Sequence, residues 1–312
     1  METKAVSDNS ESDRSLSAVV SAQSNASARD VTRVDMSGLR KLNIRPTLGL
    51  YVKQLIERRH FIVADARYRA FRTVKSYRLW RFWLIAQPLL EAAMYGVLFG
   101  LVLKTSRGID NFIGFLVLGV TFFGFVSSLV GGGQSLIQTS RNLITAFSFP
   151  RASLVLSQSL RYMIDNITPI LVAVVFALCA QWGKPLSPTI PLFIPITLLM
   201  WMFGTGFMFI VARITAFIPD AKVLINLAMR AWFFSSGVFF SVERYASSPL
   251  MSAVMTNNPA YIFLTAIRGV VIYGEVPSAS TWLTLLAWSL GAFVLGFVFF
   301  WEAESRYVRV KQ

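Results

Sequence analysis

The stretch Phe112–Val130, FIGFLVLGVTFFGFVSSLV, decides the fold class, because it is long, apolar and free of charged residues. A helix rises about 1.5 Å per residue, so about 20 apolar residues cross the hydrocarbon core of a bilayer. Five further segments are long and apolar enough to do the same: Phe82–Leu103, Met163–Trp182, Pro191–Val211, Val223–Phe240 and Trp282–Trp301. We therefore expect an all-α integral membrane protein with six spans, whose third helix begins either at Met163 or farther back, near Ala152.

Charge predicts the topology and the partners. The chain has 312 residues, with 30 Lys and Arg against 16 Asp and Glu, and a net charge of +14. In a soluble protein this excess would indicate nucleic acid, but here the basic residues flank apolar spans, which indicates anionic lipid headgroups instead. Six spans with a cytoplasmic N-terminus place 17 Lys and Arg inside and 5 outside. This bias predicts a multi-pass protein of the cytoplasmic membrane with both termini inside, and no nucleic-acid partner.

Two segments precede the spans. Residues 1–45 are rich in Ser, Asn and Asp and contain no aromatic residue, so we expect a disordered cytoplasmic tail. Residues 49–80 predict an amphipathic helix along the membrane surface. Its apolar face recurs every three or four positions, at Phe61, Ala64, Tyr68, Phe71 and Val74. The same pattern also fits a solvated helix that packs on a partner protein.

The apolar region Leu250–Tyr273 does not fit a simple span. The sequence TNNP at 256–259 and the charge of Arg268 divide it into pieces that are too short to cross a bilayer. We expect an extracytoplasmic re-entrant helix pair whose polar ends are shielded by protein. The alternative is a seventh, kinked span. Residues 81–303 then form the membrane domain, and residues 304–312 form a cytoplasmic tail.

The sequence gives no indication of catalysis. The phosphate-binding motif G-x-x-x-x-G-K-[ST] is absent, and the one histidine, His60, has no partner for metal binding. The long segment between the last two predicted spans contains two acids, Glu243 and Glu275, which are far apart. We expect no catalytic site, no metal site and no cofactor bound by this chain.

Polar and aromatic residues within the spans favour transport. Glu91 lies inside the first span, where a charge is costly, so it either faces a path or pairs with a neighbour such as Arg230. Arg161 and Asp165 are four residues apart and are expected to pair on one helix face. The aromatic residues either contact lipid or line a lumen over which sugar rings slide. The expected lining set is Glu91, Phe122, Phe123, Phe125, Trp201, Trp232, Phe233 and Phe239.

Three stretches follow one another in a recognisable order. They are LWRFWLIAQPLLEAAMYGVLFG at 79–100, RNLITAFSFPRASLVLS at 141–157 and FFSSGVFFSVERYASSPLMSAVMTNNPAYIFLTAIRGVVIYGEVPS at 233–278. Together they resemble the transmembrane subunit of ABC-2 type polysaccharide exporters, the family that serves O-antigen, capsule, teichoic acid and mycobacterial galactan. The resemblance covers about residues 60–310. The serine-rich N-terminal extension and Glu91 depart from the family pattern.

The resemblance implies that the segment after the second span is a coupling helix, which docks on a separate ATPase subunit. The alternative is a membrane-surface loop anchored by Phe147 and Phe149. Pro150 is expected to end or redirect the helix, and Arg141 and Arg151 are expected to pair with acidic groups of the partner. The coupling set is Arg141, Asn142, Leu143, Ile144, Thr145, Phe147, Pro150 and Arg151.

The expected function is export of a lipid-linked glycan such as O-antigen, galactan or teichoic acid. One six-span bundle leaves little room for a polymer, so we expect a homodimer with two ATPase subunits that bind the ATP and Mg. The lipid pyrophosphate is expected to enter at Arg67, Arg69, Arg72 and Arg81, and the outer gate is expected at Asn257, Asn258, Pro259, Tyr261 and Arg268. The alternatives are an ABC-2 exporter of lipids or drugs, a membrane glycosyltransferase or ligase, and a secondary transporter, for which the sequence has no internal repeat.

Overall fold

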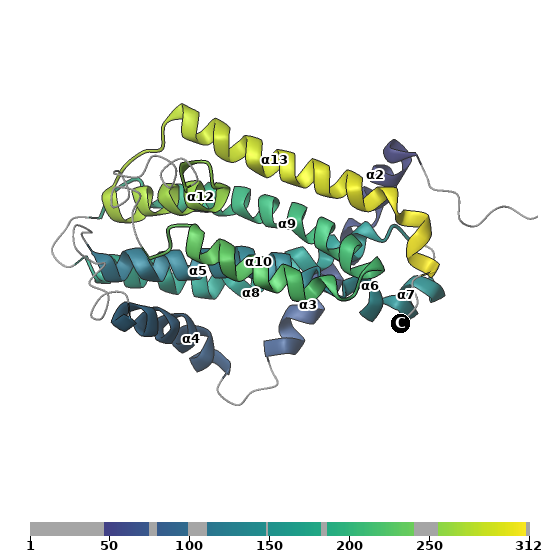
Figure 1. Ribbon diagram of the computed structural model, residues 1–312, viewed down its shortest axis with the longest axis horizontal. Helices are drawn as coiled ribbons and strands as arrows, with labels where there is room; N and C mark the ends of the chain where they lie inside the picture. The colour runs from purple at the N-terminus through teal and green to yellow at the C-terminus, as the bar shows by residue number, and fades with distance from the viewer. Residues whose placement is uncertain are drawn as a thin grey trace, which may run out of the picture. The chain divides into compact units, whose positions relative to one another are not determined.

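The computed structural model describes residues 47–74, 80–98, 111–147, 149–181, 186–239 and 255–309, and the regular elements in these ranges are all helices (Figure 1). The predicted all-α class is therefore confirmed for the described chain. These residues belong to one unit, Arg45–Gln312. The predicted tail 1–45 lies outside the described residues.

Within the described residues, four helical segments are long and apolar enough to cross a bilayer: α5 (Phe112–Gly132), α8 (Ala152–Cys179), η2 with α9 (Ile190–Leu192 and Phe193–Phe217) and α13 (Ala279–Glu302). They lie at the places predicted for the second, third, fourth and sixth spans, and α8 takes the earlier of its two expected starts. At the places predicted for the first and fifth spans, α4 (Trp80–Tyr95) and α10 (Ala221–Ser235) are shorter within the described residues. The count of six spans stays a prediction.

The central helix is α5, which packs against α4, α8, α9 and α12 and buries most of its side chains. Asn111 begins it with a left-handed backbone, and its side-chain oxygen accepts a hydrogen bond from the Gly114 N–H at 3.0 Å. This cap satisfies one of the amide donors that a helix N-terminus leaves without an intrahelical partner. The sequence between the first two spans therefore fixes where the central helix starts.

Helices α9 and α13 lie along each other (Figure 1). Their backbones touch at Gly206 and Gly296, where a Cβ added to Gly296 would lie 2.1 Å from the Gly206 carbonyl oxygen. Inside a membrane, apolar side chains gain little by leaving lipid for protein, so close backbone contact through small residues stabilises helix pairs. These two glycines set the distance between α9 and α13.

The amphipathic segment differs from the prediction of one helix over 49–80. It forms two helices, α2 (Leu48–Glu57) and α3 (Arg59–Val74), which are separated at Arg58. The face that α3 buries against α8 is Ile62, Ala66 and Ala70. Phe61 and Tyr68, from the predicted apolar face, are exposed on the unit. Contact of that face with a membrane stays a prediction.

Short elements gather at the two ends of the long helices. Figure 1 shows α6 (Leu136–Thr139), α7 (Arg141–Ala146) and the C-terminal η5 (Glu304–Arg309) at one end. The opposite end holds α12 (Pro259–Arg268), which continues as η4 (Gly269–Tyr273). The predicted re-entrant pair also involves residues 250–254, which lie outside the described chain, so the pair stays a prediction.

Candidate functional site

The predicted coupling segment forms a short helix with one buried face and one exposed face. Ile144 of α7 is buried, whereas Arg141, Asn142 and Thr145 are exposed and Leu143 is partly buried. Directly after α7, Phe147 has an extended backbone and a side chain that is 64% exposed. The segment therefore presents an aromatic side chain on a firmly anchored base, which suits docking into a partner.

Two details of this segment correct the sequence analysis. The helix ends at Ala146, before Pro150, because Phe147 already leaves the helical conformation. Pro150 is buried instead and precedes Arg151, the N-cap residue of α8. Arg151 does not need an acidic partner from another protein, since its Nη1 lies 3.1 Å from Glu304 Oε1 of the same chain. The docking role of Arg141 stays a prediction.

The Glu304 cluster, which consists of Tyr51, Arg151, Ala152 and Glu304, joins the two ends of the chain to this segment. Glu304 Oε1 accepts hydrogen bonds from the Arg151 N–H and from Arg151 Nη1, at 2.9 and 3.1 Å. Glu304 Oε2 accepts one from the Tyr51 hydroxyl at 2.7 Å. Burial raises the pKa of the Glu304 carboxyl, and the donors from Arg151 and Tyr51 partly oppose that shift. The sequence analysis missed Glu304 and Tyr51.

A cavity of about 350 Å³ opens between α4, α5 and α10. Of the predicted lining set, Glu91, Phe123 and Phe233 line it, together with Arg230. Both alternatives for Glu91, a group that faces a path and a partner of Arg230, stay predictions. The other lining residues are Tyr95, Val120, Gly124, Ser127, Asn226 and Met229, three of which carry a polar side-chain group.

The other five predicted lining residues pack within the protein. Phe122, Phe125 and Phe239 are fully buried. The indole N–H of Trp201 donates to the Ser159 carbonyl at 3.2 Å, and that of Trp232 donates to the side chain of Asn258 at 2.8 Å. A lumen lined by these five side chains needs an arrangement other than the one described, so their role in a path stays a prediction.

Aromatic side chains nevertheless form a continuous group beside the cavity. Phe233 contacts both Tyr95 and Phe123, with ring centroids 5.6 and 5.1 Å apart. Phe123 also meets Trp232 edge to face at 5.7 Å. Edge-to-face and tilted pairs of this kind stabilise packing beyond simple burial. The cavity is therefore lined by packed aromatic side chains together with two charged ones, Glu91 and Arg230.

The predicted outer gate divides into a structural part and a pocket. Asn258 begins α12: its Oδ1 accepts from the Ala260 N–H at 3.1 Å, and its Nδ2 donates to the Ser235 carbonyl at 3.1 Å. Pro259 occupies the first turn of the same helix, where its missing N–H costs nothing. Asn257 is exposed. These residues connect the end of α10 to the start of α12.

Arg268, predicted at the gate, lies in the core. It is 2% exposed and donates to the carbonyl oxygens of Phe115, Gly237 and Val238, at 3.2, 2.9 and 3.0 Å. Its guanidinium carbon also lies 3.4 Å from the centre of the Phe115 ring. These contacts hold α12 against α5 and against the turn after α10.

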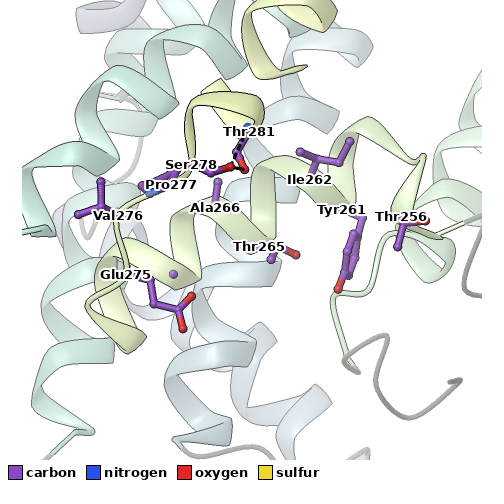
Figure 2. Close-up of a pocket in the computed structure, with 11 residues that line it drawn as sticks. Thr256, Tyr261, Ile262, Thr265, Ala266, Glu275, Val276, Pro277, Ser278 and Thr281 are labelled. Carbon is purple, nitrogen blue, oxygen red and sulfur yellow. Dashed lines mark hydrogen bonds between the residues drawn. The ribbon is translucent and has the colours of Figure 1, made fainter. Parts of the chain in front are cut away.

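A second pocket, of about 300 Å³, lies beside α12 (Figure 2). Tyr261 and Thr265 line it from one face of α12, and Glu275 lines it from the turn after η4. Ser278 and Thr281, at the start of α13, contribute hydroxyl groups. Tyr261 is thus the predicted gate residue that reaches an open space.

The predicted entry residues are only partly described. Arg67 is exposed. Arg69 donates to Asp65 at 2.9 Å, and Asp65 in turn accepts a hydrogen bond from Ser157 of α8. The side chains of Arg72 and Arg81 lie outside the described residues.

Two other expectations concern pairing and metals. The predicted pair of Arg161 and Asp165 is confirmed, with Nε and Oδ2 3.3 Å apart. Among the residues that the structure describes, no group of three His, Cys, Asp or Glu side chains is placed to hold a metal ion.

Comparison with known proteins adds two findings. A family model described as ABC-2 type transporter matches residues 63–272. The chain is also 23% identical, over 227 residues, to the O-antigen export system permease protein RfbA of Myxococcus xanthus. That alignment covers 72% of this chain and 82% of the relative. The matched region includes α7, the cavity between α4, α5 and α10, and α12 with η4.

Proposed function

The chain belongs to the ABC-2 type transporter family, and on this premise we propose that it exports a lipid-linked polysaccharide as the membrane subunit of an ATP-driven transporter. The protein is a transporter permease, not an enzyme. The observation that carries the choice of substrate is the similarity to an O-antigen export permease over most of both chains. The glycan here is of the O-antigen, galactan or teichoic acid type.

The cavity between α4, α5 and α10 supports a carbohydrate substrate. Tyr95, Phe123 and Phe233 offer aromatic surfaces, while Glu91 and Arg230 offer polar groups for hydroxyls. Flat apolar rings let sugar rings slide without strong discrimination between successive units. About 350 Å³ holds a few sugar residues at most, so a polymer passes through an enclosure that two copies of the chain complete. We therefore propose a homodimer.

ATP hydrolysis takes place in a separate subunit, of which two copies bind the dimer. The exposed side chain of Phe147, on an anchored α7, is the contact that we assign to this subunit. A rigid helix transmits a displacement to α8, whereas a loose loop would absorb it. Arg67 of α3 attracts the pyrophosphate of the lipid carrier. Both termini lie in the cytoplasm.

Removal of the chain tests the substrate. In cells depleted of it, lipid-linked glycan is expected to accumulate on the inner leaflet and to disappear from the surface. Surface glycan that stays at its normal level after depletion would refute polysaccharide export. If the purified transporter hydrolyses ATP faster with phospholipid or a drug than with lipid-linked glycan, the alternative of a lipid or drug exporter replaces the proposal.

A single substitution tests the ATPase contact. Phe147→Ala is expected to reduce co-purification of the ATPase subunit without loss of folded permease. Leu283→Ala is the matched control, because Leu283 is exposed to a similar extent, 67% against 64%, and lies near the opposite end of the helices. Equal recovery of the ATPase with both variants would remove Phe147 from the contact.

A further inference from the structure

The N-terminus of α8 lacks a cap from its own sequence. Arg151, at the N-cap position, makes no side-chain capping bond, and the first turn contains no acidic residue. The first amides of a helix have no intrahelical acceptor, and they carry partial positive charge that an anion stabilises. A capping group for α8 must therefore come from elsewhere in the chain.

That group is Glu304, from the start of η5. Its Oε1 accepts from the Arg151 N–H at 2.9 Å, and its Oε2 accepts from the Tyr51 hydroxyl at 2.7 Å. The oxygen of Tyr51 in turn accepts from the Ala152 N–H at 3.0 Å. The carboxylate of η5 and the phenol of α2 thus accept from two successive amides at the N-terminus of α8, that of its N-cap residue Arg151 and that of its first residue Ala152. Glu304 and Tyr51 are almost completely buried, at 2% and 1% exposed.

The position of this cluster is the second observation. Arg151 lies four residues after Phe147, the side chain assigned to the ATPase contact. Between them, Phe149 and Pro150 are buried, and the ring of Phe149 lies 6.1 Å from Phe61 of α3. η5 also contacts α7 directly. The chain that leaves α7 is therefore held on several sides before α8 begins.

Aromatic packing connects the same cluster to α9 and α13. Tyr307 of η5 stacks on Phe300 of α13 and on Phe217 of α9, with ring centroids 4.7 and 5.7 Å apart. Its hydroxyl donates to the Phe300 carbonyl at 2.9 Å. Tyr51 of α2 lies 6.0 Å from Phe297 of α13. Four helices therefore converge on the carboxylate of Glu304 and its neighbours.

We propose that Glu304 is a positioning residue for energy coupling, which locks the junction of α7 and α8 to α2 and α13. This inference rests on the proposed function. A displacement of α7 then moves α8 and α13 together, because the junction does not deform. Without the carboxylate, α7 yields at the junction, and ATP is hydrolysed without an equal displacement of the spans.

The hydrogen-bond pattern explains why a carboxylate is required. Glu304 receives three donors and donates none. A glutamine has one acceptor oxygen and an NH₂ group that only donates, so its amide would face the hydroxyl of Tyr51 in place of Oε2. That hydroxyl already accepts from Ala152, and its proton would lose its acceptor. Glu304→Gln therefore keeps the size of the side chain and breaks the connection to α2.

The test uses the complete transporter with its ATPase subunits in lipid nanodiscs or vesicles. Glu304→Gln is expected to assemble normally and to reduce the glycan transported per ATP hydrolysed by roughly tenfold, a change of the size seen when one residue alters coupling between distant sites. Glu302→Gln is the matched control, because Glu302, the last residue of α13, is exposed and pairs with Arg213 of α9 outside the Glu304 cluster. The same ratio in the Glu304→Gln variant, the Glu302→Gln variant and the wild type would overturn the proposal.

Two further measurements keep the outcome decisive. If Glu304→Gln does not assemble, Tyr51→Phe removes only the bridging hydroxyl and is expected to lower the same ratio. Amide hydrogen exchange on the permease alone, without substrate, measures whether the hydrogen bonds at the start of α8 are formed. The amides of Arg151 and Ala152 are expected to exchange faster in both variants. Faster exchange with unchanged coupling would show a purely structural cap and overturn the proposal. Failure of the wild type to transport glycan, with the exchange result intact, would count against the proposed function instead.

Discussion

Replacement of Arg268 by methionine is expected to destabilise the membrane domain through lost hydrogen bonds, not through lost volume. Methionine keeps an unbranched side chain of similar length but has no donor. Arg268 donates to carbonyl oxygens of Gly237 and Val238, which lie in the turn after α10, and of Phe115 in α5. The Phe115 carbonyl lies in a continuous helix, where it also has an intrahelical donor, so the other two lose the most.

The magnitude follows from those two carbonyls. A buried acceptor that loses its donor costs about 1–3 kcal/mol, so Arg268→Met is expected to cost about 2–6 kcal/mol. Relief from burying a guanidinium offsets part of this cost, whereas loss of the contact with the Phe115 ring, 3.4 Å from the guanidinium carbon, adds to it. Arg268→Lys is expected to lose less, because an ammonium still reaches one of the carbonyls.

The assay is thermal unfolding of the purified permease in detergent, with Arg230→Met as the control. Arg230 is exposed at the cavity, and its replacement is expected to change stability by at most about 0.5 kcal/mol. An Arg268→Met variant that is as stable as the wild type would refute the reasoning, because the carbonyls would then be satisfied in another way.

A second variant makes the test sharper. A Cβ at Gly119 would lie 2.2 Å from Nη2 of Arg268, so Gly119→Ala is expected to push the guanidinium away from its acceptors. In the double variant Gly119→Ala with Arg268→Met, the clash with the guanidinium is absent, and only the milder approach of the Cβ to the Val238 carbonyl oxygen, 3.1 Å, is left. The two effects are therefore expected to be strongly non-additive. Simple additivity would show that Gly119 and Arg268 are not coupled as described.

Three other predictions concern helix contacts and pH. Gly296→Ala is expected to lower the melting temperature, because its Cβ would meet the Gly206 carbonyl, whereas Gly291→Ala, with nothing within 4 Å of its Cβ, is expected to leave it unchanged; equal melting temperatures would contradict the close packing. Asn258→Ala is expected to cost about 1 kcal/mol, since it removes the N-cap of α12, and chemical denaturation of the variant measures the loss. Burial raises the pKa of the Glu304 carboxyl above its ordinary 4.5, so ionisation of this group costs more free energy in the folded protein than in the unfolded chain, and the free energy of unfolding falls as pH rises from about 4.5 through the raised pKa. Glu304→Gln is expected to flatten that part of a stability profile, and an unchanged profile would refute the assignment.

Three residues interact with the Glu304 carboxyl: Tyr51, Arg151 and Tyr307. Tyr51 from α2 and Arg151 from the start of α8 donate to it, and Tyr307 lies on the same short helix. Burial, with the nearby Glu304 charge, raises the pKa of both tyrosines, so neither ionises in the range tested. Glu304 is therefore the group of the cluster that titrates.

Hydropathy predicted the long helices because burial of an apolar run in lipid depends only on local sequence. The spans at Phe112–Val130, Pro191–Val211 and Trp282–Trp301 are found in α5, α9 and α13 with ends that differ by a few residues. The break at Arg58 was not predicted, because apolar residues continue on both sides of it. Periodicity reports a helical face, and a single turn residue does not disturb it.

The sites could be predicted only where the pattern was local. The pair of Arg161 and Asp165 follows from a spacing of four, and it is present. Glu304 and Arg151 are 153 positions apart, and no pattern in the sequence joins them. One signal was available: α8 has no capping residue of its own at its N-terminus, and a buried amide requires an acceptor from somewhere. That requirement predicts that some residue of the chain accepts the hydrogen bond, but it does not identify which residue.

The polar residues of this apolar chain share one physical role more often than they line a path. Asn111 and Asn258 each accept from an amide in the first turn of a helix, and Glu304 accepts from the amide of the N-cap residue of α8. Arg268 donates to carbonyls in a turn. In lipid, backbone groups at helix ends have no water to bind, so the chain must supply their partners. A polar residue near a predicted helix end is therefore best interpreted first as a backbone partner. Glu91 is different, because it lies within α4 and borders a cavity, and a charge in that position remains the stronger indication of a transport path.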